Sequence, residues 1–198
     1  MKLPVIVLGA GGHARVLLDV LRLCKVKVLG VTDAQPSHVD KRKLQTPVLG
    51  TDKAVLAYSP KKVLLVNGLG SVSVTPKRAE IFKYFKDLGY HFAKAIHPSA
   101  IVAKDVQLGE GVQVMAGSVI QTGCKIGNNT IINTRVSIDH DCNIGSHVHI
   151  APGAVLSGGI SIGEGCHLGP CSVVIQGISI APRSFIRAQL LVHRRVKS

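Results

Sequence analysis

The sequence predicts a parallel β-helix that follows a small α/β domain. The main observation is a six-residue period, because every sixth residue from Ile96 to Val192 is Ile, Leu or Val without interruption. Such repeats are typical of β-helices, in which each short strand points one aliphatic side chain inward before the chain turns. Three strands close a coil, and about five stacked coils are expected. A glycine-rich turn after an apolar run near the N-terminus and an aromatic content of only 4% agree with this architecture.

The composition is that of a folded chain without export or membrane signals. Hydrophobic residues make up 46% of the sequence, yet no run of eighteen apolar residues is present. The start, Met1 to Pro4, leads directly into an expected strand, so we expect a cytoplasmic protein without a membrane partner. Five cysteines lack CxxC spacing, which argues against a disulfide framework and a zinc knuckle. Cys124 and Cys142 are expected to stack as small interior residues.

Positive charge is concentrated in the first domain. The formal net charge is +13, and residues 1–95 hold 16 Lys/Arg against 6 Asp/Glu, compared with 8 against 5 in 96–198. A second basic cluster, from Arg183 to Lys197, lies at the end of the chain. Without RNA-binding aromatic motifs or a helix-turn-helix pattern, this field favours small phosphorylated metabolites over nucleic acid.

We divide the chain into an α/β domain over 1–95 and a β-helix over 96–198. In the first domain, strands and helices alternate, which indicates a small parallel sheet. Strands are expected at 5–8, 26–31, 62–67 and 91–96, and helices at 14–24, 52–57 and 76–88.

A nucleotide-binding fingerprint follows the first strand. Gly9-x-Gly11-x-x-Ala14, with Asp33 after the second strand, matches the pattern in which glycines admit a phosphate to a helix start and an acid accepts ribose hydroxyls. Alone it would suggest an NAD oxidoreductase. The domain, however, is half as long as a dinucleotide fold, so we interpret the motif as a site for one nucleotide, with a purely structural glycine turn as the alternative. His13 is placed to touch a phosphate or uracil ring, or else is an exposed polar residue at a helix start.

A histidine and a carboxylate lie together in an open column of the β-helix. His140 is expected in line with Thr122 and Gly158, and Asp141 in line with glycines, so small side chains leave the pair accessible. A histidine beside a carboxylate is the usual composition of a general base. Because alternation along a strand points neighbours apart, direct pairing requires a bend at the corner or help from another subunit.

His149 and His167 are eighteen residues apart and form a second column. This histidine ladder is either functional or an exposed polar edge.

Several segments together resemble the NeuD/PglD family of bacterial sugar acetyltransferases. They are GAGGHARV at 9–16, HPSA at 97–100, NT at 133–134, DHDC at 139–142 and HVHIAPGA at 147–154. The family includes sialic-acid O-acetyltransferases and nucleotide-aminosugar N-acetyltransferases, and the likeness covers nearly the whole chain. It implies an α/β Rossmann-like half domain, a left-handed β-helix, a homotrimer and active sites between subunits.

The resemblance also implies roles for individual residues. His140 would be the general base, Asp141 would raise its basicity, and His149 would touch acetyl-CoA. Backbone groups near Pro170 and Ala188 would border the pantetheine arm. The nucleotide part of the substrate would be bound by residues of the first domain, namely Gly11, Gly12, His13, Asp33 and Gly68. From charge alone, we expect the phosphates of acetyl-CoA to reach the basic C-terminal cluster.

The expected activity is direct N-acetylation of a nucleotide-linked amino sugar, with acetyl-CoA as co-substrate and no metal. O-acetylation of a sialic-acid-type sugar is the alternative within the family. The end of the chain departs from the family pattern at Pro170-Cys171 and at 187–190, which keeps a non-catalytic nucleotide-sugar-binding protein as another alternative. A γ-class carbonic anhydrase, with zinc held by histidines such as His147, is a further alternative, although that class lacks a nucleotide-binding front domain.

Overall fold

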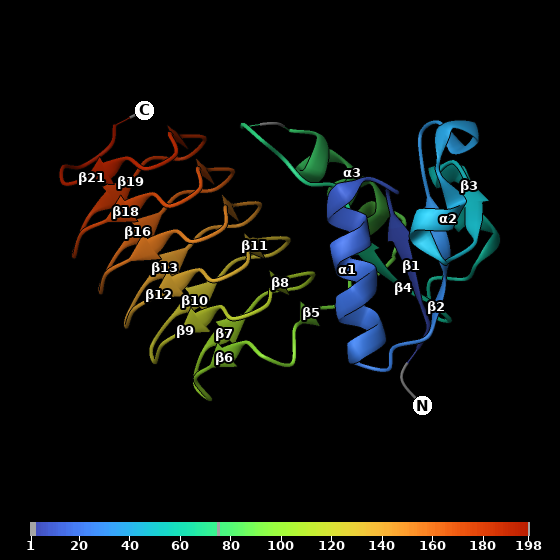
Figure 1. Ribbon diagram of the computed structural model, residues 1–198, viewed down its shortest axis with the longest axis horizontal. Coiled ribbons are helices and arrows are strands. Elements are labelled where there is room, and N and C mark those ends of the chain that lie inside the picture. The colour runs from blue at the N-terminus through green and yellow to red at the C-terminus, as the bar shows by residue number, and fades with distance from the viewer. Residues whose placement is uncertain (1–2, 75, 198) are drawn as a thin grey trace.

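The computed structural model describes residues 3–74 and 76–197, which form an α/β domain and a β-helix side by side (Figure 1). The first domain is a four-stranded parallel sheet with strand order β3-β2-β1-β4. Its elements are β1 (Val5–Leu8), α1 (Gly12–Leu23), β2 (Val28–Thr32), a 3₁₀ turn (Pro36–His38), α2 (Lys41–Leu44), β3 (Val48–Gly50), a 3₁₀ helix (Asp52–Ala57), β4 (Leu64–Asn67) and α3 (Lys77–Asp87). The strand order reverses at β1, and the crevice at such a reversal is where open parallel sheets bind ligands.

The helix α1 forms because its apolar residues recur on one face. Leu17, Leu18 and Leu21 are buried against the sheet, while Gly11 precedes the helix as its N-cap. The helix ends at Leu23 with Cys24 as its C-cap, and Lys25 adopts a positive φ of 54° that turns the chain toward β2. The helix therefore starts two residues before the predicted position, at the glycine turn itself.

Some predicted elements of this domain differ in the structure. The segment Asp52–Ala57 is a 3₁₀ helix, and β2 is shifted to Val28–Thr32. β3 was not predicted, since three residues carry too little periodicity for detection. The strand expected at 91–96 was largely wrong: Phe92 makes one bridge to Leu65, and only Ala95–Ile96 forms a strand, which pairs within the β-helix. The chain leaves the first sheet here because it has to cross to the second domain.

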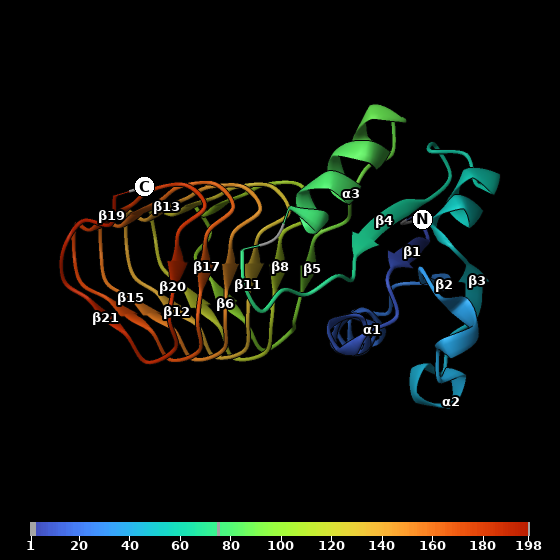
Figure 2. The ribbon, with the colours of Figure 1, turned by 90° about the horizontal axis from the view of Figure 1, so that it is seen from above.

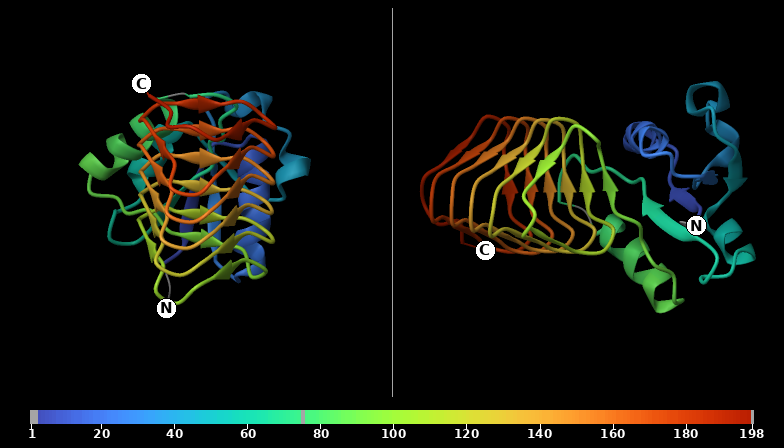
Figure 3. Two further views of the ribbon diagram at one scale, coloured as in Figure 1. Left: turned by 90° about the vertical axis from the view of Figure 1, so that its left-hand side faces the viewer. Right: turned by 90° about the horizontal axis from the view of Figure 1, so that it is seen from below.

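The second domain is a left-handed parallel β-helix with three flat sheets (Figure 3). Sheet B contains β5 (Ala95–Ile96), β8 (Gln113–Val114), β11 (Ile131–Ile132), β14 (His149–Ile150), β17 (His167–Leu168) and β20 (Phe185–Ile186). Sheet C contains β6 (Ile101–Val102), β9 (Val119–Ile120), β12 (Ser137–Ile138), β15 (Val155–Leu156), β18 (Val173–Val174) and β21 (Leu191–Val192). Sheet D contains β7 (Gln107–Leu108), β10 (Lys125–Ile126), β13 (Asn143–Ile144), β16 (Ser161–Ile162) and β19 (Ser179–Ile180).

The repeat fixes the register of every coil. Each strand pairs in parallel with the strand eighteen residues away, as in Ile126 with Ile144, which confirms the predicted coil length. The second residue of each strand points inward, and these aliphatic side chains stack into one continuous core. Cys124 and Cys142 are buried in that core, as predicted. A glycine ends many of the sheet D strands because the next coil passes close by; a Cβ at Gly145 would lie 2.8 Å from the amide nitrogen of Glu164.

The first domain packs against sheet B. Residues 68–74, which follow β4, run along this sheet past β5 and β8 (Figure 2). Buried hydrogen bonds join the two domains there, including the one from Gln113 Nε2 to the carbonyl of Asn67 at 2.7 Å. The outward side chains of sheets C and D are exposed or half-buried, so the three faces of the β-helix have different surroundings.

Candidate functional site

The predicted histidine and carboxylate pair is formed at the turn between sheets C and D. Nδ1 of His140 lies 2.9 Å from Oδ2 of Asp141, and both side chains are accessible. The bend that this pairing requires comes from Asp141 itself, whose φ of 60° turns the chain at the corner. Asp139 Oδ1 accepts a hydrogen bond from the backbone N–H of His140 at 2.8 Å and holds the turn. No second subunit is needed to bring the two side chains together.

Glycines above and below make room for this pair. A Cβ at Gly158 would lie 2.5 Å from Nε2 of His140, and a Cβ at Gly123 would collide with the carboxylate of Asp141. The expected columns are therefore present. Since Asp141 accepts the proton of Nδ1, Nε2 keeps its lone pair and faces the space that Gly158 leaves open.

The electrostatics suit a base. The hydrogen bond to Asp141 raises the pKa of His140, and the negative charges of Asp139 and Asp141 act in the same direction. A more basic imidazole binds a substrate proton more strongly in the transition state. Cys142, the nearest thiol in sequence, points into the core, where its Sγ donates to the carbonyl of Ser157 at 3.2 Å. Burial raises the pKa of that thiol to about 11, so it is not available as a thiolate nucleophile.

A separate cavity of about 700 Å³ lies at the carboxyl ends of β1 and β4. It contains all five predicted nucleotide-binding residues, Gly11, Gly12, His13, Asp33 and Gly68, together with His149. Gly11 and Gly12 border open space, since a Cβ at either position would meet no atom within 4 Å. The first turn of α1 has no acidic residue and no side-chain cap, so its N–H groups are suited to an anion.

Asp33 and Gly68 shape the floor of this cavity. Asp33 Oδ2 accepts a hydrogen bond from the N–H of Ala10 at 3.1 Å, and Oδ1 accepts from the N–H of Gln35 at 2.9 Å. The carboxylate thus holds the glycine-rich turn in place. A Cβ at Gly68 would lie 2.7 Å from the carbonyl oxygen of Leu8, so the close approach of β4's end to β1 requires glycine here.

The histidine ladder is buried, and the exposed-edge alternative is wrong. His149 and His167 are paired in adjacent coils and are 7% and 4% exposed, because the connection between β4 and α3 lies over them. Burial, with the positive charges of His167, Arg78 and His13, lowers the pKa of His149 to about 3.

Both ring nitrogens of His149 have partners within the chain. Asn133 Oδ1 accepts from the N–H of Thr134 at 2.8 Å, so its Nδ2 donates to Nε2 of His149 at 3.2 Å. Nδ1–H of His149 therefore donates to Ser71 Oγ at 2.8 Å. Ser71 and Gln113, which hydrogen-bonds His13, were not predicted, because no repeat or motif of the sequence marks them as site residues.

Pro170 and Ala188 lie together at the corner between sheets B and C. They occupy equivalent positions of adjacent coils, and the carbonyl of Pro170 accepts a hydrogen bond from the N–H of Gln189 at 2.8 Å. Neither residue lines the cavity around Gly11 and Asp33, and neither His140 nor Asp141 does. Within one chain, the site residues thus form three groups: the cavity, the His140 corner and the Pro170 corner.

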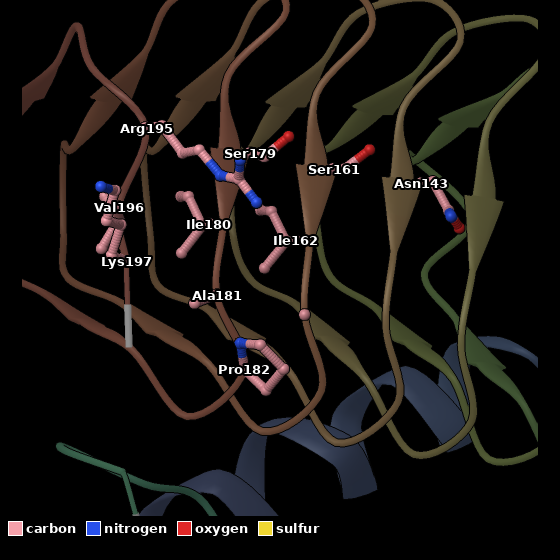
Figure 4. A pocket seen from close by; sticks show the side chains of 11 residues that line it. Asn143, Ser161, Ile162, Ser179, Ile180, Ala181, Pro182, Arg195, Val196 and Lys197 are labelled. Atoms are coloured by element: carbon pink, nitrogen blue, oxygen red, sulfur yellow. The ribbon is translucent and has the colours of Figure 1, made fainter.

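A further cavity of about 650 Å³ lies on the outer face of sheet D near the end of the chain (Figure 4). Arg195 and Lys197 line it together with Ser161 and Ser179. The tail is held there by backbone pairing, since the N–H of Val196 donates to the carbonyl of Ser179 at 3.0 Å. This cavity contains two cations of the predicted basic C-terminal cluster.

Two kinds of feature are absent from residues 3–74 and 76–197. No group of three or more His, Cys, Asp or Glu side chains converges in a way that could hold a metal ion. Within the same ranges, no helix has the length and hydropathy needed to span a membrane.

Comparisons with protein families match both domains. Residues 4–85 match the PglD N-terminal domain, and residues 123–158 match the bacterial transferase hexapeptide (six repeats). Among curated proteins, the UDP-3-O-acylglucosamine N-acyltransferase of Leptothrix cholodnii is 30% identical over 117 residues, which are 54% of this chain. The match spans only 33% of the length of that relative.

Solved structures resemble the chain over nearly its whole length. PerB from Caulobacter crescentus, in complex with CoA and GDP-perosamine, is 37% identical with a TM-score of 0.90; the match covers 98% of this chain and 90% of PerB. The acetyltransferase domain of PglB from Neisseria gonorrhoeae, in complex with acetyl coenzyme A, is 28% identical with a TM-score of 0.87 and covers 97% and 93% of the two chains.

Proposed function

Because the chain belongs to the NeuD/PglD-type family of sugar acetyltransferases, we propose that it transfers the acetyl group of acetyl-CoA to the amine of a nucleotide-linked amino sugar. The observation that carries this proposal is the pairing of His140 with Asp141, which leaves Nε2 facing the space beside Gly158. The arrangement supplies a base at an accessible corner, and transfer then needs no covalent enzyme intermediate.

The reaction uses few protein groups. The sugar amine attacks the thioester carbonyl, and Nε2 of His140 takes the proton that the nitrogen loses as the C–N bond forms. When the C–S bond breaks, the sulfur of CoA leaves and receives that proton from the imidazolium. Asp141 stabilises the imidazolium between these two steps, because its carboxylate lies 2.9 Å from Nδ1. Positioned backbone N–H groups would stabilise the oxyanion.

The nucleotide of the substrate is assigned to the cavity around Gly11, Gly12, His13, Asp33 and Gly68. Its phosphates would meet the N-terminus of α1, where N–H groups and the helix dipole favour negative charge. Lys77 also lines this cavity and adds positive charge. The complex of PerB with GDP-perosamine makes that nucleotide sugar the first candidate to test.

A homotrimer is supported by the outer face of sheet C. The first residues of its strands point outward and are mostly aliphatic, with Ile101 at 65%, Val155 at 41% and Leu191 at 53% exposure. The equivalent residues of sheet D are polar, and those of sheet B are buried except Phe185 in the last strand, which is 50% exposed. An uncovered aliphatic face of this kind indicates a subunit interface.

Assembly through sheet C would also complete the site. One edge of this sheet carries His140, and the opposite edge carries Pro170 and Ala188. Around a threefold axis that passes along sheet C, the first edge of one subunit meets the second edge of the next. Acetyl-CoA would then lie between subunits, with its thioester near His140 and its pantetheine arm along Pro170 and Ala188.

The phosphates of acetyl-CoA are assigned to the cationic cavity at the end of the chain. Arg195 and Lys197 lie there three coils above His140, which is on the order of 15 Å at the spacing of stacked strands. For His149, the bonds to Ser71 and Asn133 favour a role in ordering the cavity wall, and contact with acetyl-CoA would require one of these bonds to open.

We place the enzyme in the cytoplasm, where acetyl-CoA and nucleotide sugars are made.

The test measures thiol release from acetyl-CoA with GDP-perosamine, with UDP- and dTDP-linked 4-amino-6-deoxysugars and with free sialic acid, followed by mass spectrometry of the product. N-acetylation of one amino sugar is expected. Turnover on sialic acid alone would instead assign O-acetylation. Nucleotide binding without any turnover would assign the non-catalytic alternative, and activity that requires zinc would favour the carbonic anhydrase alternative.

A further inference from the structure

Arg78 is a buried cation next to the nucleotide cavity that the mechanism above does not use. It is the second residue of α3, and its side chain is almost completely buried. Its guanidinium donates hydrogen bonds to the carbonyl of Leu69 and, at 2.8 and 3.2 Å, to the carbonyl and Oδ1 of Asn129. Over the described ranges 3–74 and 76–197, no carboxylate forms an ion pair with it.

Burying a guanidinium in this way is unfavourable for stability alone. An unpaired buried charge loses its hydration, and Nε of Arg78 is buried without a partner. The cost is visible in the pKa of Arg78, which burial lowers to about 9. Retaining an arginine rather than an apolar residue here therefore points to a role beyond packing.

The bond to Leu69 fixes the start of the loop that lines the cavity. The N–H of Leu69 donates to Asn67 Oδ1 at 3.2 Å, while its carbonyl accepts from Arg78. Both polar groups of this residue are thus held by buried side chains. Leu69, Gly70 and Ser71 all line the cavity, so their positions depend on this clamp.

The same network reaches His13. Asn67 Nδ2 donates to Asn129 Oδ1 at 3.1 Å, next to the guanidinium, and the carbonyl of Asn67 accepts from Gln113 Nε2. Since the amide nitrogen of Gln113 faces Asn67, its Oε1 accepts the proton of His13 Nε2 at 2.7 Å. His13 is therefore held as the Nε2–H tautomer, with Nδ1 as an acceptor.

We propose that Arg78 is a positioning residue of the nucleotide-sugar cavity, which acts by clamping the Leu69 carbonyl and by fixing His13 as the uncharged Nε2–H tautomer through the buried amides. The proposal rests on the proposed function for the identity of the ligand. An uncharged His13 agrees with its pKa, which burial lowers to about 4. The hydrogen bond to Gln113 opposes this shift, and the positive charge of Arg78 adds to it. The other ionisable groups lining the cavity are Asp33, Lys77 and His149.

The test compares Arg78→Met, Arg78→Lys and a matched control, Arg22→Met. Arg22 also donates to a backbone carbonyl of the same domain, that of Leu44 at the end of α2 at 2.6 Å, but Leu44 does not line the cavity, whereas Leu69 does. Calorimetry with GDP and UDP measures binding, and ¹⁵N imidazole spectra of the free protein report the tautomer and titration of His13. Thermal unfolding of each variant monitors folding.

Arg78→Met is expected to weaken binding of the nucleotide that the native protein prefers by about 10-fold or more, to leave the KM for acetyl-CoA unchanged, and to shift the His13 titration to higher pH. Arg78→Lys should change the titration of His13 less than it weakens nucleotide binding, because an ammonium keeps the charge but not the forked geometry of the guanidinium. Native affinity and an unchanged His13 spectrum in Arg78→Met, or an equal loss in Arg22→Met, would overturn the proposal. If the native protein binds neither nucleotide, the substrate assignment fails, and the His13 spectra alone decide the role of Arg78.

Discussion

Nε2 of His140 faces the position that a side chain at residue 158 would occupy, at 2.5 Å from the place of a Cβ atom. Gly158 does not have a positive φ, so Gly158→Ala changes the available volume more than the backbone. We predict that this variant lowers kcat at least about 10-fold, because a misplaced base transfers protons poorly. Steady-state kinetics measure the effect. Gly89→Asn, at a glycine of the first domain with a φ of 83° and open space at its Cβ position, is the control and should retain native activity, because Asn tolerates this backbone conformation.

The hydrogen bond from His140 to Asp141 predicts a change in pH dependence. Asp141 raises the pKa of His140, and the base works only when it is neutral, so activity should rise as the pH rises through that pKa. In Asp141→Asn the pKa is lower, which moves the rise to lower pH, while the maximal rate falls because the base is weaker. A kcat profile between pH 5 and 9 measures both effects. If kcat of Asp141→Asn rises over the same pH range as kcat of the native protein, the role assigned to Asp141 is contradicted.

Acid should destabilise the protein through its buried histidines. The pKa of His13 is lowered to about 4 and that of His149 to about 3, from 6.5 in the unfolded chain. The unfolded state therefore binds more protons below pH 6.5, so stability is full above that pH and is lost as the pH falls toward 3 to 4. We predict a fall in Tm over this window that is less steep in His149→Gln. Equal slopes in the two proteins would contradict the burial of a neutral His149.

The six-residue period was sufficient to predict the β-helix, since every strand packs one aliphatic side chain into the same continuous core. It also placed His140 in line with Thr122 and Gly158, and Asp141 in line with two glycines, because these columns are a direct consequence of an eighteen-residue coil. The left-handed sense of the β-helix was predicted from the family resemblance, because the spacing of the repeats is the same for either hand. The cover over His149 was not predictable, because it comes from a loop distant in sequence, and neither were the amides Gln113 and Asn129, whose partners lie in the other domain.

Assembly through sheet C predicts that a charge on this face abolishes activity. Val155→Glu would place like charges together around the threefold axis, each losing its hydration. We expect a monomer by sedimentation velocity and little acetyl transfer, because the Pro170 corner of a neighbour would be absent. Gln107→Glu, which adds the same charge on the outer face of sheet D, is the control and should remain assembled and active. A monomeric native protein with full activity would contradict a site between subunits.

The central claim is that His140 is the general base of acetyl transfer. The most direct measurement compares kcat of native protein and His140→Ala, with the amino sugar found in the substrate panel, alongside the KM of both substrates and calorimetric nucleotide binding. The account predicts a kcat reduced about 100-fold or more, with nucleotide binding unchanged because His140 does not line that cavity. A kcat within about threefold of native, with both substrates still bound, would contradict the account.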